Sequence, residues 1–178
     1  MLAMGVETSV PASAYAALGD EGTRALIAIF ERTSAPKHVR LRALAALAEL
    51  NDERAARYLV RLVEARDAAH MAALGELHPA RSAGVLRRAM RGLAGRPGLL
   101  RSASVLPYLT HRDASIRAAA VRLLAHHPEP AVTAALRARL QSESARAVRE
   151  ALANALRDRS APPASPPPDA PRTGSPPR

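Results

Sequence analysis

The sequence predicts an all-α fold in which helices pair into hairpins and the hairpins stack into a short solenoid. Residues 113–124 carry the clearest signal, because their apolar residues recur at the spacing of one helix face. Asp113 precedes them and suits the N-cap, where a carboxylate accepts hydrogen bonds from backbone amides of the first turn. The same pattern recurs at residues 39–47 and 148–156, and such self-similarity indicates a repeat protein. The apolar residues of the first stretch are Ile116, Ala119, Ala120, Leu123 and Leu124.

Composition supports helix packing and excludes several classes of site. Of 178 residues, 48% are hydrophobic but only 2% are aromatic, so alanine and leucine must supply most of the core, which favours helix-on-helix packing. The absence of cysteine excludes disulfides, thiolate metal sites and cysteine nucleophiles. No apolar run approaches the ~20 residues that span a bilayer, and the first 18 residues lack the basic residues of a secretory signal. We therefore expect no membrane association and a cytoplasmic location.

The chain divides into three predicted segments. Residues 1–18 have no clear helical period and form an N-terminal segment that is a candidate cap of the solenoid. Residues 19–160 form the solenoid domain, with about four helical hairpins plus one extra helix. Residues 161–178 contain 8 prolines and no large apolar residue, so they cannot bury enough surface to order themselves. We predict a disordered, proline-rich tail there.

The hairpins are assigned from the helical periods and from the breaks between them. The second helices begin their apolar pattern at Val39, Ala69, Ile116 and Val148. The interval of 47 residues from Ala69 to Ile116 exceeds the other two, which are 30 and 32 residues, so the helix that carries Val85 is interpreted as the extra one. Within 99–109, Pro107 should kink the helix or shift its start. The predicted pairs are 23–33 with 37–50, 53–64 with 68–77, 99–109 with 113–124, and 131–140 with 145–157.

Residues 110–124 resemble a HEAT repeat of the bacterial kind called phycobilisome-lyase HEAT-like. The resemblance covers about residues 20–158 and implies hairpins stacked into a right-handed α-solenoid whose second helices line the concave face. It also implies a ladder of Asp and Arg side chains between neighbouring repeats. Pro36 and Ala145 stand where Asp113 has its counterparts, so two of the four units lack the acidic partner. The resemblance is strongest at Asp113, Ile116, Arg117, Ala120 and Leu124, and at Val148, Arg149, Ala151 and Leu156.

Recurring arginines and the six histidines are better explained by structure than by chemistry. Arg40, Arg117 and Arg149 share one position of the repeat, and we interpret them as braces between repeats rather than anion ligands. His126 and His127 are adjacent, hence on different helix faces, and no His-Glu dipeptide occurs of the kind used by the di-iron HEAT-repeat hydroxylase. No P-loop, G-x-S-x-G, H-E-x-x-H or dinucleotide-binding motif is present. We expect no catalysis, no cofactor and no metal.

The net charge of +10 comes from the second half of the chain. Residues 1–80 carry 9 basic and 10 acidic side chains, whereas residues 81–160 carry 15 and 5. Arg87 and Arg91 are one helical turn apart, with Arg88 at their flank. Two interpretations stay open: a solvated helix face in an arginine-rich chain, or a surface for an anionic partner that relieves the self-repulsion. The six arginines of this predicted cluster, with no acid among them, are Arg81, Arg87, Arg88, Arg91, Arg96 and Arg101.

A solenoid has an extended surface, and the sequence contains no recognisable set of catalytic residues. We therefore predict a non-catalytic module or scaffold for protein–protein interaction. We expect a protein partner, and an acidic one if the arginine cluster takes part. The alternative is sequence-independent nucleic-acid binding, in which the basic second half contacts backbone phosphates. The chain has four aromatic residues and no Trp, which leaves little for bases to stack on, so this alternative is less favoured.

Overall fold

The computed structural model describes residues 17, 19–64, 68–79 and 81–160. Within these residues the chain is helical and has no strand, as the sequence predicts. The predicted tail and nearly all of the predicted N-terminal segment lie outside the described residues. The α-helices are α2 (Gly19–Glu31), α3 (Lys37–Glu49), α4 (Glu53–Glu64), α5 (Ala68–Ala73), α6 (Ala83–Leu93), α7 (Ser102–Val105), α8 (Ala114–Leu124), α9 (Pro130–Ser142) and α10 (Arg146–Ser160). The 3-10 helices are η1 (Gly75–Leu77), η2 (Pro97–Leu99) and η3 (Leu106–Thr110).

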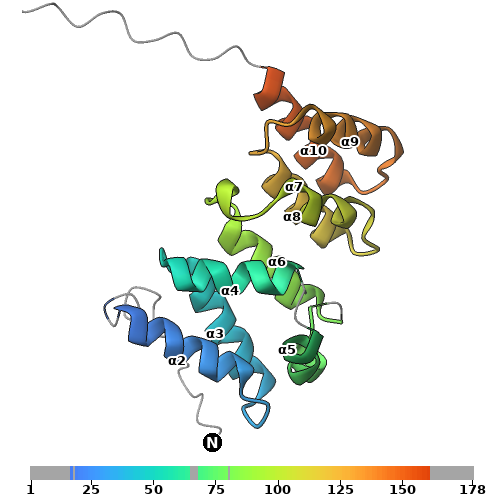
Figure 1. The fold of residues 1–178 in the computed structure, drawn as a ribbon. Coiled ribbons are helices and arrows are strands. Elements are labelled where there is room, and N and C mark those ends of the chain that lie inside the picture. Colours follow the sequence, from blue (N-terminus) through green and yellow to red (C-terminus); the bar gives the residue numbers. More distant parts are fainter. Residues whose placement is uncertain (1–16, 18, 65–67, 80, 161–178) are drawn as a thin grey trace, which may run out of the picture.

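The helices form two layers of a short solenoid. One layer contains the second helices of the hairpins, in which α3 packs against α6, α6 against α8, and α8 against α10. The other contains their partners: α2 packs on α3, α4 on α6, η3 on α8 and α9 on α10. Figure 1 shows α6 between the helices α2 to α4 and the helices α7 to α10. The described chain therefore contains four stacked hairpins, with α5 and η1 inserted between α4 and α6.

The second hairpin differs from the prediction. The predicted partner of residues 53–64 was 68–77, but α4 packs against α6. The extra helix is α5, which is only six residues long. The 3-10 helix η1 follows it. Gly75 has φ +60°, a left-handed conformation that favours glycine and ends a helix. The buried side chains Met71, Leu74 and Leu77 attach this insertion to the core.

With α6 as the second helix of its hairpin, the repeat becomes regular from there onward. Val85 takes the place that the sequence analysis gave to Ala69, and the intervals from Val85 to Ile116 and on to Val148 are 31 and 32 residues. The helix starts are alike as well. The Ser82 hydroxyl accepts from the Val85 amide at 3.4 Å, and the Asp113 carboxylate accepts from the Ser115 amide at 2.8 Å. The Asp113 N-cap is confirmed, and the long interval lies before α6 rather than after it.

Two local features shape the hairpins around α6. Gly92 lets α6 approach its neighbours closely, since a Cβ there would lie 2.7 Å from the Ala48 Cα atom of α3 and 2.6 Å from a Leu59 methyl of α4. The predicted helix over 99–109 is divided into α7 and η3, because Pro107 has no backbone amide to continue the α-helical ladder. The start at Ser102 agrees with the shift expected from Pro107.

Candidate protein-binding face

The six arginines of the predicted cluster differ in their exposure to solvent. Arg81, Arg87, Arg91 and Arg101 are exposed. Arg88 is half-buried and its guanidinium donates to the Gly84 carbonyl of its own helix at 3.2 Å. The members of the cluster therefore differ in exposure and in how many of their donors are already used.

Arg96 has a structural role in the loop between α3 and α4. Its guanidinium donates to the Leu50 carbonyl at 2.8 Å, to the Asn51 side-chain oxygen at 2.9 Å and to the Asp52 carbonyl at 2.9 Å. These contacts join the end of α6 to the preceding hairpin across more than forty residues of sequence. Most of the donors of Arg96 are consequently occupied by the fold.

Two members of the cluster, Arg87 and Arg91, line a groove of about 290 Å³ between α6 and α8. The third guanidinium of this groove belongs to Arg122 of α8, which the sequence analysis did not single out. The floor is apolar, and Met90 and Ala119 in it are 1% and 7% exposed. We call this site the basic groove, lined by Arg87, Met90, Arg91, Ala94, Ala119 and Arg122.

Arg122 could have been found from the repeat with the correct register. Arg91 stands six residues after Val85, and Arg122 stands six residues after Ile116, so the two arginines occupy equivalent positions in successive repeats. The equivalent residue of the next repeat is Asn154. The assignment of α5 as the second helix concealed this correspondence.

A second groove, of about 480 Å³, continues from the basic groove and shares Ala94 and Arg122 with it. It lies between α8 and α10 and carries two acids, Glu150 and Asp158, on the α10 side. We call it the mixed groove. Its other lining residues are mostly small: Ala125, His126, Ala147, Ala151, Asn154 and Ala155.

Buried polar contacts hold α8 and α10 in the positions that form the mixed groove. The Arg117 guanidinium donates to the Glu143 carboxylate at 2.8 and 2.7 Å and to the carbonyls of His111 and Arg112 at 2.8 and 3.1 Å. The hydrogen bonds from Arg117 lower the pKa of Glu143 far below its ordinary value, and Glu143 in turn raises the pKa of Arg117. At the other end of α8, the Arg159 guanidinium donates to the Leu124 and His127 carbonyls.

These contacts confirm the bracing interpretation for two of the three recurring arginines. Arg117 braces the third and fourth hairpins, and the buried Arg40 donates to the Phe30 carbonyl at 2.7 Å and to the Leu74 carbonyl at 3.2 Å. Arg149 is exposed. The acid that seemed to be missing at Ala145 is supplied two residues earlier by Glu143, whose carboxylate also accepts from the Ala145 amide at 2.9 Å.

Comparison with known protein families agrees with this arrangement. A family model of HEAT repeats matches residues 102–167. The third and fourth hairpins of this chain are similar to HEAT repeats. The match begins at the first residue of α7, so it contains the third and fourth hairpins, and α2 to α6 continue the same two-layer stacking before it. No curated protein and no solved structure matches the chain.

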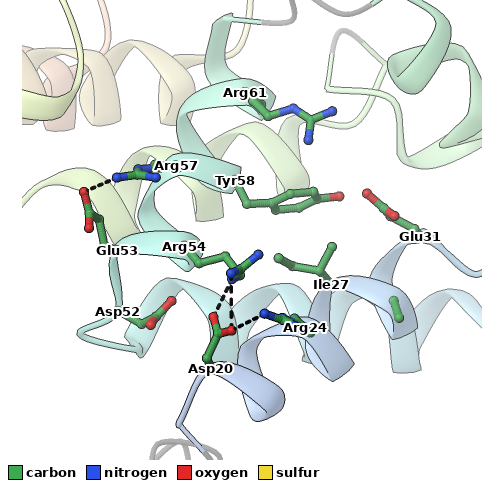
Figure 2. Close-up of a pocket in the computed structure, with 11 residues that line it drawn as sticks. Asp20, Arg24, Ile27, Glu31, Asp52, Glu53, Arg54, Arg57, Tyr58 and Arg61 are labelled. Atoms are coloured by element: carbon green, nitrogen blue, oxygen red, sulfur yellow. Dashed lines mark hydrogen bonds and ion pairs between the residues drawn. The ribbon is translucent and has the colours of Figure 1, made fainter.

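The layer that contains α2 and α4 has another hollow, a cleft of about 710 Å³ shown in Figure 2. Several of the charged residues that line it form ion pairs with one another. The Asp20 carboxylate accepts from Arg24 at 2.6 Å and from Arg54 at 2.5 Å, and the hydrogen bond from Arg54 is the main cause of its lowered pKa. The Tyr58 hydroxyl points toward Glu31, and burial raises the pKa of this hydroxyl. Acids and arginines are equal in number among the residues that line this cleft, whereas the basic groove is lined by arginines and no acid.

The described residues show no group of three or more His, Asp or Glu side chains that could hold a metal ion. None of the helices in the described part of the chain is long and apolar enough to cross a membrane.

Proposed function

We propose that this chain is a non-catalytic protein-binding module that holds a segment of its partner along α6, α8 and α10. The observation that carries the proposal is the continuity of the basic and mixed grooves, which share Ala94 and Arg122. HEAT repeats generally mediate protein–protein interaction or scaffolding, and stacked hairpins provide an extended surface for such contacts.

The lining of the two grooves supports contact with a partner's backbone and small side chains. Ala94, Ala147 and Ala151 are only partly buried or exposed, and their short side chains leave room for a neighbouring chain to approach. The floor is apolar and the rim is charged, which is the usual anatomy of a protein interface.

The charges of the face favour a protein over nucleic acid. A track for backbone phosphates should be positive throughout. The mixed groove instead presents Glu150 and Asp158, and Arg96 is already committed to the loop between α3 and α4. The described Phe and Tyr residues also offer bases little to stack on, since Phe30 and Tyr58 are buried and Tyr108 is half-buried, with its hydroxyl donating to the Val63 carbonyl at 2.6 Å.

Affinity capture with quantitative mass spectrometry tests this proposal, run with and without nuclease. The bait is compared with a variant that fills the mixed groove, Ala147→Tyr with Asn154→Tyr, both at exposed positions of α10. The matched control adds the same bulk to α9 in the other layer, as Ala134→Tyr with Ala138→Tyr, also at exposed positions. We expect a protein whose capture survives nuclease, is lost with the α10 variant and is kept with the α9 variant. Equal capture by both variants, or capture that nuclease abolishes, would contradict the proposal.

A further inference from the structure

We propose that the basic groove is a carboxylate-binding subsite that receives an acidic side chain of the protein partner. This inference rests on the proposed function and assigns a chemistry to one part of its face. The ligands are the guanidinium groups of Arg87 and Arg91 from α6 and of Arg122 from α8, which line the same groove of about 290 Å³.

The three guanidinium groups have almost no hydrogen-bond or ion-pair partners among the described residues. Arg91 and Arg122 are exposed and make no hydrogen bond or ion pair with any described residue. Arg87 has a single long contact, 3.5 Å from its Nη1 atom to the Ser115 hydroxyl. By contrast, the guanidiniums of Arg96 and Arg117 each make several hydrogen bonds within the fold.

The positive charge of the groove is not balanced locally. No acidic residue lines it, and like charges one helical turn apart, such as Arg87 and Arg91, repel each other. A carboxylate that enters between α6 and α8 relieves this repulsion. The planar guanidinium fork matches a carboxylate in a two-point hydrogen bond, and such charge-assisted bonds are stronger than neutral ones.

The mixed groove adds a second charge requirement on the same partner segment. Glu150 and Asp158 lie on its α10 side, while Arg122 belongs to both grooves. A segment that lies along the face therefore places acidic residues over the basic groove, small apolar residues over Ala94 and Ala125, and a basic residue beside α10. The geometry thus points to a partner segment whose two ends carry opposite charges.

The probe is a short capped peptide with two glutamates at one end, alanines in the middle and two lysines at the other end. NMR titration of the full chain follows the side-chain Nε–Hε signals of the arginines. We expect the signals of Arg91 and Arg122 to shift, and the same peptide with glutamine in place of glutamate to bind much more weakly. Binding should weaken as salt rises, because charges at exposed sites are screened over ~10 Å at 0.1 M.

The decisive comparison uses two double variants with the same change of charge. Arg91→Gln with Arg122→Gln removes guanidiniums from the groove, whereas Arg81→Gln with Arg101→Gln removes exposed arginines of the predicted cluster outside it. We expect the first to raise the peptide Kd about tenfold and the second by less than about twofold. Because all four side chains are exposed, the circular dichroism spectrum and the thermal midpoint should match those of the wild type.

Two results of the binding measurements would overturn the subsite. One is an equal rise of the peptide Kd in the two double variants, which would mean that the exposed arginines attract the peptide only through their overall positive charge. The other is tighter binding of a short DNA duplex than of the peptide, with the loss confined to Arg91→Gln with Arg122→Gln, which makes the groove a phosphate site. Retained partner capture by that variant, together with loss by Ala147→Tyr with Asn154→Tyr, would reject the subsite and leave the proposed function standing. Retained capture by both variants would reject both.

Discussion

Arg117 and Glu143 form a two-point ion pair between the first turn of α8 and the segment before α10, with N–O distances of 2.8 and 2.7 Å. The Glu143 side chain is fully buried, and it also accepts from Arg139 at 2.9 and 2.7 Å. The pair joins residues 26 apart in the sequence and fixes the boundary between the third and fourth hairpins. The mixed groove lies along that same boundary, so its shape depends on this pair.

Replacing Glu143 should be strongly destabilising. Glu143→Gln leaves the buried guanidinium of Arg117 without its charged partner, and breaking one side of a buried pair costs about 3 kcal/mol of unfolding free energy. Urea denaturation followed by circular dichroism measures the loss. The control is Glu150→Gln, which removes an exposed pair with Arg146 and should cost less than about 0.5 kcal/mol. Similar losses in the two variants would show that the buried pair does not hold the boundary.

The same carboxylate predicts acid sensitivity. The pKa of Glu143 is lower in the folded chain than its unfolded value of about 4.3, so its stabilising contribution is complete above that pH and is lost as pH falls through the folded pKa. Between pH 7 and pH 3 the wild type should therefore lose more unfolding free energy than the Glu143→Gln variant, which has no carboxylate to protonate at this position. Asp113 and Asp20 also have lowered pKa values, so the Glu143→Gln variant keeps a smaller acid dependence. Denaturation at pH 7 and pH 3 measures how far the unfolding free energy of each protein falls with pH. An equal fall in the wild type and the Glu143→Gln variant would show that Glu143 does not cause the acid sensitivity.

Gly92 should tolerate no side chain. In Gly92→Ala the new Cβ meets the Ala48 backbone at 2.7 Å, so α6 must move away from α3 at a cost of about 1 to 3 kcal/mol. The matched control is Gly95→Ala, where nothing lies within 4 Å of the new Cβ, and the change should stay within about 0.5 kcal/mol. Thermal unfolding of the two variants gives the comparison. A Gly92→Ala variant as stable as Gly95→Ala would mean that α6 does not pack this closely on α3.

The arginines of the predicted cluster should divide into structural and surface members. Arg96→Gln removes hydrogen bonds to Leu50, Asn51 and Asp52 and should cost about 1 to 3 kcal/mol. Arg91→Gln removes an exposed charge and should change stability by about 0.5 kcal/mol or less. Urea midpoints of the two single variants measure the difference, and a reversed order would contradict the roles given to these residues.

Much of the fold can be predicted from helical periodicity, because an amphipathic helix records its buried face in the sequence. The helices around Ile116 and Val148 were identified in this way, with the Asp113 N-cap. The sequence pattern shows less directly which helices pair with one another. Residues 68–77 carry an apolar period much like that of α6, and only the three-dimensional packing shows that α4 pairs with α6 while α5 is inserted.

The candidate site could be predicted only in part, because periodicity shows which residues share one helix face but not which helices are neighbours. Arg87 and Arg91 share one helix face, so their common location follows from the sequence. Arg122 comes from the neighbouring helix and could be linked to them only through the correct repeat register. Arg96 could not be separated from the cluster by composition, because its acceptors belong to a loop more than forty residues away. Glu143 was missed because it stands two residues before the position where the acid was expected.

Site-specific photocrosslinking in cells tests the central claim most directly. A benzophenone amino acid is placed at Ala147 or Asn154 on the α10 side of the mixed groove, and at Ala134 or Ala138 on α9 as controls, all at exposed positions. We expect a crosslink to one and the same protein from both α10 positions and none to that protein from the α9 positions. A crosslink to the partner from α9 alone, with none from α10, would contradict the proposal that α6, α8 and α10 form the binding face.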